Sequence, residues 1–420
     1  MQSDAVIRNI QARKVFNSRG SPTIEIQIST TTASSQITAP SGASTGVHEV
    51  VSYPPRGVEE AIELVNDVIA PKLRNFHIDN QKAFDGILHE IDGTNNFQKI
   101  GGNTAFALSL ALGKIAALSK KLPFFRYLSN EAAVILPQPL GNVLGGGKHA
   151  GGRTPDIQEF LVLPMATSSF SEAIWANISV HMRVRELLTH ADTNFTGGKG
   201  DEGAWAPNLT NVEALEVVTR AAEEVSEELG VDVRVGLDVA ASSFWDEQKG
   251  YVYDGENERR NCGEQIDYML DLIHTYNLVY VEDPLHENDF SGFAELTKKA
   301  GSCLICGDDL FTTNPNRLRH GIQSRAGNSI IIKPNQIGTL TETVETVTVA
   351  TQAGYIPVAS HRSGETCDTY LAHLAVGLHC PIVKLGVVGG ERIAKINELI
   401  RIEEGLGETS KIANLHIGGR

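Results

Sequence analysis

The sequence lacks any long apolar run. No stretch of its 420 residues approaches the roughly 20 apolar residues of a membrane-spanning helix. The N-terminal segment "MQSDAVIRNIQARK" also lacks the apolar centre of a signal peptide. We therefore expect a cytoplasmic protein without a membrane span.

Basic residues are also in short supply. The chain has 36 lysines and arginines against 51 aspartates and glutamates, which gives a formal net charge of −15. A surface with this excess of negative charge repels the phosphates of nucleic acids and the headgroups of anionic membranes. We therefore expect no nucleic-acid partner.

Cysteine is scarce as well, with five residues in the chain. An odd, small number fits a reducing compartment. Cys303 and Cys306 form a C-x-x-C pair in the strand-like run "SCLICGDDL", where side chains three positions apart point to opposite faces of a sheet. Because no second pair and no nearby histidines accompany them, a redox or zinc role is disfavoured.

The remaining composition is that of an ordinary globular protein, with 41% apolar and 21% charged residues. The first third of the chain mixes element types. "TIEIQIST" alternates like an antiparallel strand, while "VEEAIELVNDVIAPKLRNF" and "NTAFALSLALGKIAALSKK" have helical periodicity. This pattern predicts a small α+β domain over residues 1–132.

The pattern becomes regular over residues 133–420. Two strand-like runs, "PQPLGNVLGGG" and "IQEFLVLP", precede two long amphipathic helices, and strand and helix then alternate six times. Two strands plus six make eight, and eight mostly parallel strands with outer helices close into a barrel. The fold class is therefore α/β, an eightfold β/α barrel preceded by an α+β cap.

The six alternating strands are predicted to end in ionisable residues. These residues are Asp238, Glu282, Asp308, Lys333, His361 and Lys384. One lysine at a strand end could simply extend its ammonium group into solvent. Six ionisable groups at the same point of six units instead indicate an active site, because the carboxyl ends of barrel strands share one mouth.

Three of these groups, Asp238, Glu282 and Asp308, are carboxylates. Placed together they would repel one another unless a cation neutralised them, and oxygen ligands suit Mg²⁺ better than zinc. Each acid could alternatively cap the helix that follows it. For Asp309 we favour that capping or turn role.

The two lysines, Lys333 and Lys384, should lie beside the acids. A lysine near a second cation and a metal loses basicity and can accept a proton near neutral pH. Such a set could remove a proton α to a carboxylate held by the metal. Arg362 and Ser363 in "SHRSGET" would suit a phosphate group, although Arg362 could instead form a salt bridge within its loop.

Three glycine-rich loops contain small, polar residues: "APSGASTG", "NVLGGGKHAGGRTPD" and "FTGGKGDEGAWAPN". Neither of the first two fits a phosphate-binding P-loop, and the chain has no dinucleotide fingerprint. We expect lids that close on the substrate, with flexible linkers as the alternative. Glu159 and Glu202, in or beside these loops, could each protonate a leaving hydroxide.

The chain resembles the enolase (phosphopyruvate hydratase) family along nearly its full length. The shared motifs occur in the family's order: "SRGSPTIE", "APSGASTGVHE", "GGGKHAGG", "DIQEF", "GDEGAWAPN", "VEDPLHENDF", "GDDLFTTN", "KPNQIGTLTET", "SHRSGET" and "ERIAKINELIRIEE". The resemblance implies an α+β cap on an eightfold barrel whose second strand is antiparallel. It also implies interconversion of 2-phosphoglycerate and phosphoenolpyruvate with two Mg²⁺ per active site, through a Mg-stabilised aci-carboxylate intermediate. We further expect a homodimer or larger homo-oligomer.

The resemblance also implies a role for each site residue. Asp238, Glu282 and Asp308 would bind the first Mg²⁺, and Ser44 would bind the second. Lys333 would be the general base and Glu202 the general acid, supported by Glu159. Lys384 would pair with the substrate carboxylate, Arg362 and Ser363 would bind the phosphate, and the pocket would be lined by His149, Gln158 and His361.

Some positions depart from the family pattern. Asn17 and Ser21 stand in "NSRGSP" where "DSRGNP" is usual, Ala204 replaces a glycine, Leu385 replaces a common threonine, and Gly389-Gly390 replace a more polar pair. The loop after Glu49 is short. No proposed ligand, base or acid is missing. Two alternatives stay open: another Mg-dependent lyase of the superfamily, or a non-catalytic binding protein on the same scaffold.

Overall fold

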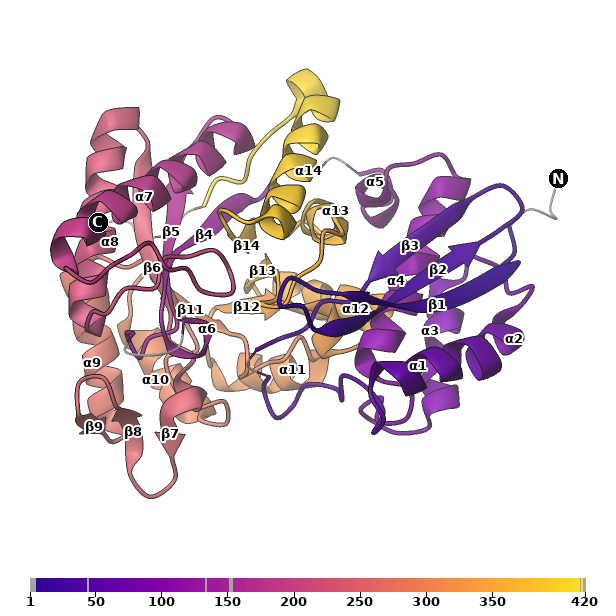
Figure 1. Ribbon diagram of the computed structural model, residues 1–420, viewed down its shortest axis with the longest axis horizontal. Coiled ribbons are helices and arrows are strands. Elements are labelled where there is room, and N and C mark those ends of the chain that lie inside the picture. Colours follow the sequence, from indigo (N-terminus) through magenta and orange to yellow (C-terminus); the bar gives the residue numbers. More distant parts are fainter. Residues whose placement is uncertain (1–4, 44, 133, 151–153, 416, 418–420) are drawn as a thin grey trace.

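The computed structural model describes residues 5–43, 45–132, 134–150, 154–415 and 417. These residues form an N-terminal α+β part and a closed eight-stranded barrel, which lie beside each other (Figure 1). The predicted fold class, a capped eightfold barrel, is confirmed. Among the residues described here, no helix is long and apolar enough to cross a bilayer.

The N-terminal part contains an antiparallel sheet in the order β1-β2-β3. Its strands are β1 Asn9–Phe16, β2 Pro22–Ser29 and β3 Ser34–Thr38. Its helical segments are α1 Val58–Leu64, the π-helical η1 Val65–Ile69, α2 Ala70–Leu73, α3 Gln81–Asp92, α4 Gly102–Ser119 and α5 Phe124–Leu128. Alternation in β2 buries Ile24, Ile26 and Ile28 on the face against which α4 packs.

The barrel strands follow the order β10-β11-β12-β13-β14-β4-β5-β6 around the closed sheet. They are β4 Gln138–Gly145, β5 Glu159–Met165, β6 Asp232–Asp238, β10 Tyr280–Glu282, β11 Leu304–Gly307, β12 Ser329–Ile332, β13 Ile356–Ser360 and β14 Ile382–Gly386. β5 is antiparallel to both neighbours, whereas the other adjacent pairs are parallel. The predicted antiparallel second strand is therefore confirmed.

Helices surround the barrel. They are α7 Phe170–Ala191, α8 Asn211–Leu229, α9 Cys262–Thr275, α10 Phe290–Lys299, α11 Pro315–Ser324, α12 Leu340–Gln352, α13 Tyr370–Gly377 and α14 Gly390–Leu406, with the short α6 Gly147–Ala150 between β4 and β5. A small sheet of β7 Trp245–Asp246, β8 Gly250–Tyr253 and β9 Glu258–Arg260 follows β6, with η2 Ala241–Phe244 between. The other short helices are η3 Pro334–Gln336 and η4 Gly407–Thr409.

The two-residue period of the barrel strands explains which side chains enter its interior. An apolar cluster fills the barrel interior away from the mouth, and it includes Leu161, Tyr280, Cys306, Ile331 and Ile382. The polar residues of the mouth lie two positions away from these apolar residues on the same strands. Because every second residue of a strand points to the same side, the polar residues also face the barrel interior. Cys303 and Cys306 are free thiols in separate apolar clusters, as their opposite directions predict.

The prediction that six strands end in ionisable residues needs one correction. Asp238 and Glu282 end β6 and β10, and three others follow the last strand residue directly. Lys384 instead lies in the middle of β14, two residues before its end, and pairs in register with Ser360. It reaches the mouth because it points inward two residues after Ile382, which belongs to the interior cluster.

The N-terminal part covers the barrel mouth with residues 41–43 and 45–50. Ser41 and Gly364 exchange two backbone hydrogen bonds of 2.8 Å, and the Val50 amide donates to the Gln336 carbonyl at 3.0 Å. Residues 42 and 43 line the pocket of the mouth. Ser44, the expected ligand of a second metal ion, lies outside the described residues.

Candidate active site

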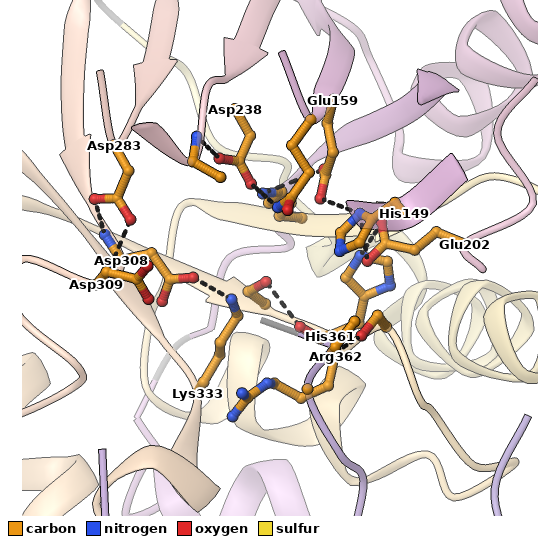
Figure 2. Close-up of a pocket in the computed structure, with 17 residues that line it drawn as sticks. His149, Glu159, Glu202, Asp238, Asp283, Asp308, Asp309, Lys333, His361 and Arg362 are labelled. Atoms are coloured by element: carbon orange, nitrogen blue, oxygen red, sulfur yellow. Dashed lines mark hydrogen bonds and ion pairs between the residues drawn. The ribbon is translucent and has the colours of Figure 1, made fainter. Parts of the chain in front are cut away.

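The pocket at the barrel mouth collects most of the residues that the sequence singled out. Figure 2 shows its acids, Lys333 and two histidines around one space. Among the predicted site residues, those lining the pocket are His149, Gln158, Glu159, Glu202, Asp238, Asp308, Lys333, His361, Arg362, Ser363 and Lys384. Glu282 lies just beneath them and contacts Lys384.

Lys384 is buried among three carboxylates. Its Nζ lies 2.7 Å from Asp238 Oδ2, 2.8 Å from Glu282 Oε2 and 3.2 Å from Glu159 Oε2. Burial works against the charged ammonium, but these carboxylates outweigh burial and raise the Lys384 pKa well above its ordinary value. Lys384 is therefore a permanent cation in the floor of the pocket.

Lys333 follows β12 directly, and its ammonium contacts the Asp308 carboxylate. Asp308 Oδ1 also accepts a 2.8 Å hydrogen bond from Gln336 Nε2. Burial disfavours the charged form of Lys333, but Asp308 outweighs it and raises the Lys333 pKa. To act as a base, Lys333 must therefore be separated from the charge of Asp308.

Asp283 is a site residue that the sequence reasoning missed. Its carboxylate accepts the backbone N–H groups of Asp308 at 2.9 Å and Asp309 at 2.7 Å. It lies in the left-handed region with φ of 39°. Carboxylate oxygens of Asp283, Asp308 and Asp309 lie within 4.8 Å of one another. The signal in the sequence that could have identified Asp283 is its position directly after Glu282 in "VEDP".

Of the capping or turn role predicted for Asp309, the helix-cap part is wrong, although the residue does lie in a turn after β11. The next helix, α11, is capped by Asn314, whose side chain accepts the amides of Asn316 and Arg317. The Asp309 side chain instead lines the pocket and is buried. Burial and the adjacent Asp308 charge raise the Asp309 pKa well above its usual value.

The structure fits a divalent metal ion on the acidic side of the pocket. Glu282 is fully buried, and its Oε1 has no hydrogen-bond partner among the residues described. A buried carboxylate oxygen without a donor is costly unless a cation meets it. The donors nearby are carboxylate oxygens, the ligand type that Mg²⁺ and Ca²⁺ prefer.

A second group of residues surrounds Glu202 on another wall of the pocket. His361 Nε2 lies 3.1 Å from Glu202 Oε2, and Asn142 Nδ2 donates to the same oxygen at 3.0 Å. His149 Nδ1 lies 3.7 Å from Glu202 Oε1 and 3.3 Å from Glu159 Oε1. Asn142, on β4, is another residue that the sequence reasoning missed.

The pKa values of the two carboxyls of this group shift in opposite directions. Burial raises the Glu159 pKa, and the Glu202 charge raises it further. Burial also opposes ionisation of Glu202, but the His361 and His149 imidazoles outweigh it and hold the Glu202 pKa well below its usual range. Environments that push the pKa values of two close carboxyls apart in this way are typical of acid–base pairs.

The histidines also differ from each other. Burial lowers the pKa of His361 to about 4, so its imidazole is neutral at neutral pH. Burial acts in the same direction on His149, but the charges of Glu202 and Glu159 outweigh it and raise the His149 pKa. The pKa values of the two histidines beside Glu202 therefore shift in opposite directions.

Arg362 and Ser363 occupy the wall below residues 41–43 and 45–50. The Arg362 guanidinium contacts Glu49 through three hydrogen bonds of 3.1 Å and Asn335 Oδ1 through one of 3.0 Å. Ser363 Oγ accepts the Ala43 amide at 2.6 Å. The alternative of a salt bridge within the loop of Arg362 is wrong, because Glu49 comes from the N-terminal part.

Gln158 completes the pocket near the first acid. Its Nε2 lies 3.5 Å from Asp238 Oδ2, and its Oε1 has no partner among the described side chains and backbone. An acceptor left free at the pocket wall is available to a donor on a bound molecule.

The departures from the family pattern lie outside the pocket lining. Ala204 is buried, and its methyl lies 3.7 Å from where a Cβ on Gly145 would be. Leu385 points outward into the apolar core. Gly389 caps α14 with φ of 106°, a conformation that glycine adopts without strain. These substitutions leave the arrangement of acids and lysines intact.

Fold and site together define a barrel enzyme of the acid–base type, with lysines and carboxyls around a metal-binding mouth. The family model of the enolase C-terminal TIM barrel domain matches residues 133–418, and that of the enolase N-terminal domain matches residues 7–128. The chain belongs to the enolase family.

Curated relatives agree over nearly the full length. The enolase of Methanosphaera stadtmanae is 54% identical over 405 residues, 96% of this chain and 98% of the relative. The enolase of Methanothermobacter thermautotrophicus is 52% identical over 96% of this chain and 97% of its own, and that of Pyrobaculum aerophilum is 45% identical over 96% and 98%.

The activity is that of a hydro-lyase, phosphopyruvate hydratase, which dehydrates 2-phosphoglycerate to phosphoenolpyruvate. The alternatives of another superfamily lyase or a binding protein are not favoured. Family membership implies a divalent metal ion, and acidic groups of the mouth could bind one.

Proposed function

We propose that Lys333 removes the C2 proton of 2-phospho-D-glycerate and that Glu202 protonates the hydroxyl that leaves C3. The observation that carries this assignment is their placement. Lys333 enters the pocket from β12 beside the acids, whereas Glu202 enters from the loop between α7 and α8 beside two histidines (Figure 2). Base and acid thus have separate walls, as an elimination across two carbons requires.

The substrate carboxylate would lie on the acidic side of the pocket. We assign Mg²⁺ to that side, with Asp238, Glu282 and Asp308 holding one ion and Ser44 contributing to a second. Bound there, the metal supplies positive charge that makes the C2 proton more acidic. Lys384 stays charged in the pocket floor and adds a cation that pairs with the carboxylate.

The acid step would use the carboxyl pair. Burial and the Glu202 charge raise the Glu159 pKa, and a carboxylate oxygen of each residue lies with a ring nitrogen of His149 within 4.8 Å. A proton shared by this pair can reach the departing hydroxyl through Glu202, while His149, Gln158 and His361 line the space around it. Arg362 and Ser363 would bind the phosphate, which would then compete with Glu49 for the guanidinium.

The wider assignments are proposals of the same kind. We propose a cap domain of residues 1–132 on a catalytic barrel of residues 133–420. A cytoplasmic location, a role in glycolysis and gluconeogenesis, and a homodimer or larger homo-oligomer accompany this activity.

The direct test is ultraviolet absorbance. The purified chain with 2-phosphoglycerate and Mg²⁺ should produce the absorbance of the phosphoenolpyruvate enol. A different superfamily lyase would consume another carboxylate and leave 2-phosphoglycerate unchanged. A binding protein would retain 2-phosphoglycerate without any change in absorbance.

Replacing Arg362 by lysine should lower kcat/KM more than about tenfold, roughly 1.4 kcal/mol of transition-state stabilisation. Lysine keeps the charge but loses the planar fork that matches a phosphate. Steady-state kinetics with Arg362→Lys and Arg319→Lys would check this, because Arg319 is an exposed partner of Glu345 far from the pocket lining. An unchanged kcat/KM would make Arg362 only a structural partner of Glu49.

A further inference from the structure

Arg392 is a fully buried arginine behind the pocket rather than in its lining. It lies in the first turn of α14. A buried guanidinium is costly unless acceptors meet its donors. Its Nη1 donates to the Arg362 carbonyl at 2.6 Å, and its Nη2 to the Ser363 carbonyl at 2.6 Å and the Asp201 carbonyl at 3.2 Å.

These three carbonyls belong to two different loops. Asp201 directly precedes the acid Glu202, whereas residues 362 and 363 form the wall assigned to the phosphate. One rigid guanidinium thus holds the acid loop and the phosphate loop at a fixed separation. A lysine ammonium, which lacks the planar fork, could not span the same set.

Arg392 also contacts the ring of His361. Its Nη1 lies 2.8 Å from His361 Nδ1, and the Gly386 amide lies 3.3 Å from the same nitrogen. A guanidinium and an amide can only donate, so Nδ1 must accept. The His361 proton therefore lies on Nε2, the nitrogen 3.1 Å from Glu202 Oε2.

The two oxygens of Glu202 consequently have different surroundings. Oε2 accepts a hydrogen bond from Asn142 Nδ2 at 3.0 Å, and His361 Nε2 lies 3.1 Å from it. Oε1 lies 3.7 Å from His149 Nδ1. The Asn142 amide and the His361 N–H lie beside the same oxygen, so these two groups fix the orientation of the Glu202 carboxyl.

Close packing keeps this arrangement in place. A Cβ on Gly386 would lie 2.2 Å from the Glu202 carbonyl, and one on Gly203 would lie 2.5 Å from the Val388 carbonyl. The acid loop therefore rests directly on the backbone that leads into α14. The Arg392 side chain extends from that helix to both loops on the side away from the pocket.

We propose that Arg392 is a positioning residue for the acid step. It fixes His361 as the Nε2–H tautomer, and His361 with Asn142 then orients the Glu202 carboxyl from its Oε2 side. This inference rests on the proposed role of Glu202. Because Lys333 and the acidic wall do not contact Arg392, removal of the C2 proton should depend on it far less than departure of the hydroxyl.

The test compares two buried cations of the same helix. Lys395 lies one turn further along α14 and contacts Glu365 and the Thr366 and Asp368 carbonyls, not His361 or the acid loop. Arg392→Lys and Lys395→Gln would be incubated with 2-phosphoglycerate and Mg²⁺ in deuterated water. Proton NMR of the mixture gives C2-proton exchange and phosphoenolpyruvate formation together.

We expect Arg392→Lys to lower product formation more than about tenfold relative to C2 exchange, a part of the contribution of a general acid. Lys395→Gln should lower both rates in the same proportion. Equal losses of the two rates in Arg392→Lys would overturn the inference. Should Arg392→Lys fail to fold, Arg392→Gln with His361→Gln provides the same comparison, and the two variants should show the same ratio.

Glu202→Gln separates this inference from the proposed function. If that variant exchanges the C2 proton without forming product while Arg392→Lys loses both rates equally, the role of Arg392 is wrong and that of Glu202 stands. If Glu202→Gln itself shows no such separation, the assignment of the acid is wrong and the inference falls with it.

Discussion

Replacing Lys333 by alanine should abolish C2-proton exchange and product formation together, whereas Glu202→Gln should abolish only product formation. The loss in each affected rate should be at least about a hundredfold, the lower range for a general acid or base. The two variants differ because base and acid act at different carbons and from different walls of the pocket.

The order of the steps explains the separation. The proton α to a carboxylate is weakly acidic, and it leaves first, toward Lys333. Departure of the C3 hydroxyl follows and needs Glu202. When Glu202 is neutral glutamine, the C2 proton can still leave and a deuteron can return from Lys333. The glutamine variant should therefore return deuterated 2-phosphoglycerate.

Proton NMR of substrate recovered from deuterated water measures this directly. Lys299→Ala is a matched control, because Lys299 is an exposed lysine on α10 that pairs with Glu295. It should exchange the proton and form product like the unmodified protein. Exchange by Lys333→Ala at the unmodified rate would show that another group removes the proton.

Much of the barrel could be predicted because the chemical type of single residues and the two-residue period of the strands indicate the same arrangement. Asp238, Glu282 and Asp308 follow apolar runs, and parallel strands place such residues at one mouth. The position of Lys384 was misjudged by two residues, yet its place in the site was correct. The direction of a side chain matters more for its place in the site than the exact end of the strand does, since every second residue of a strand faces the interior.

The missed residues depend on contacts between distant segments. The Arg362–Glu49 pair joins residues 313 positions apart, and Asn142 reaches Glu202 across 60 positions. No local pattern in a single sequence specifies such pairs. The pocket position of Asp309 was not foreseen for a related reason: turn propensity correctly describes its place in the chain, but not the carboxylates that the fold brings beside it.

The resemblance supplied what periodicity could not. A strand–helix pattern predicts a barrel, but it does not say which of two nearby acids carries a proton. That difference arises from burial and from the imidazoles around Glu159 and Glu202. The structure thus adds a physical reason for opposite pKa shifts in two residues that the sequence left as equal candidates for the acid.

Removal of the metal should abolish activity, and Mg²⁺ should restore it. Treatment with EDTA followed by titration with MgCl₂ measures this by phosphoenolpyruvate absorbance. Asp308→Asn should raise the Mg²⁺ concentration for half-maximal activity at least about tenfold, because an amide attracts a dication less than a carboxylate does. Glu295→Gln, an exposed acid on α10, is the matched control and should leave it unchanged.

Metal removal should also stop C2-proton exchange. Because this exchange needs proton removal but no release of product, its loss would assign the effect of the metal to the chemical step. Asp308 raises the Lys333 pKa in this structure, so a free Asp308 carboxylate keeps the base protonated. Asp308→Asn relieves that effect while weakening metal binding, so its rate at saturating Mg²⁺ should recover more than its metal affinity. Calorimetry of Mg²⁺ binding gives the affinity independently of turnover. Full C2 exchange in metal-stripped protein would show that Lys333 needs no metal to act as the base.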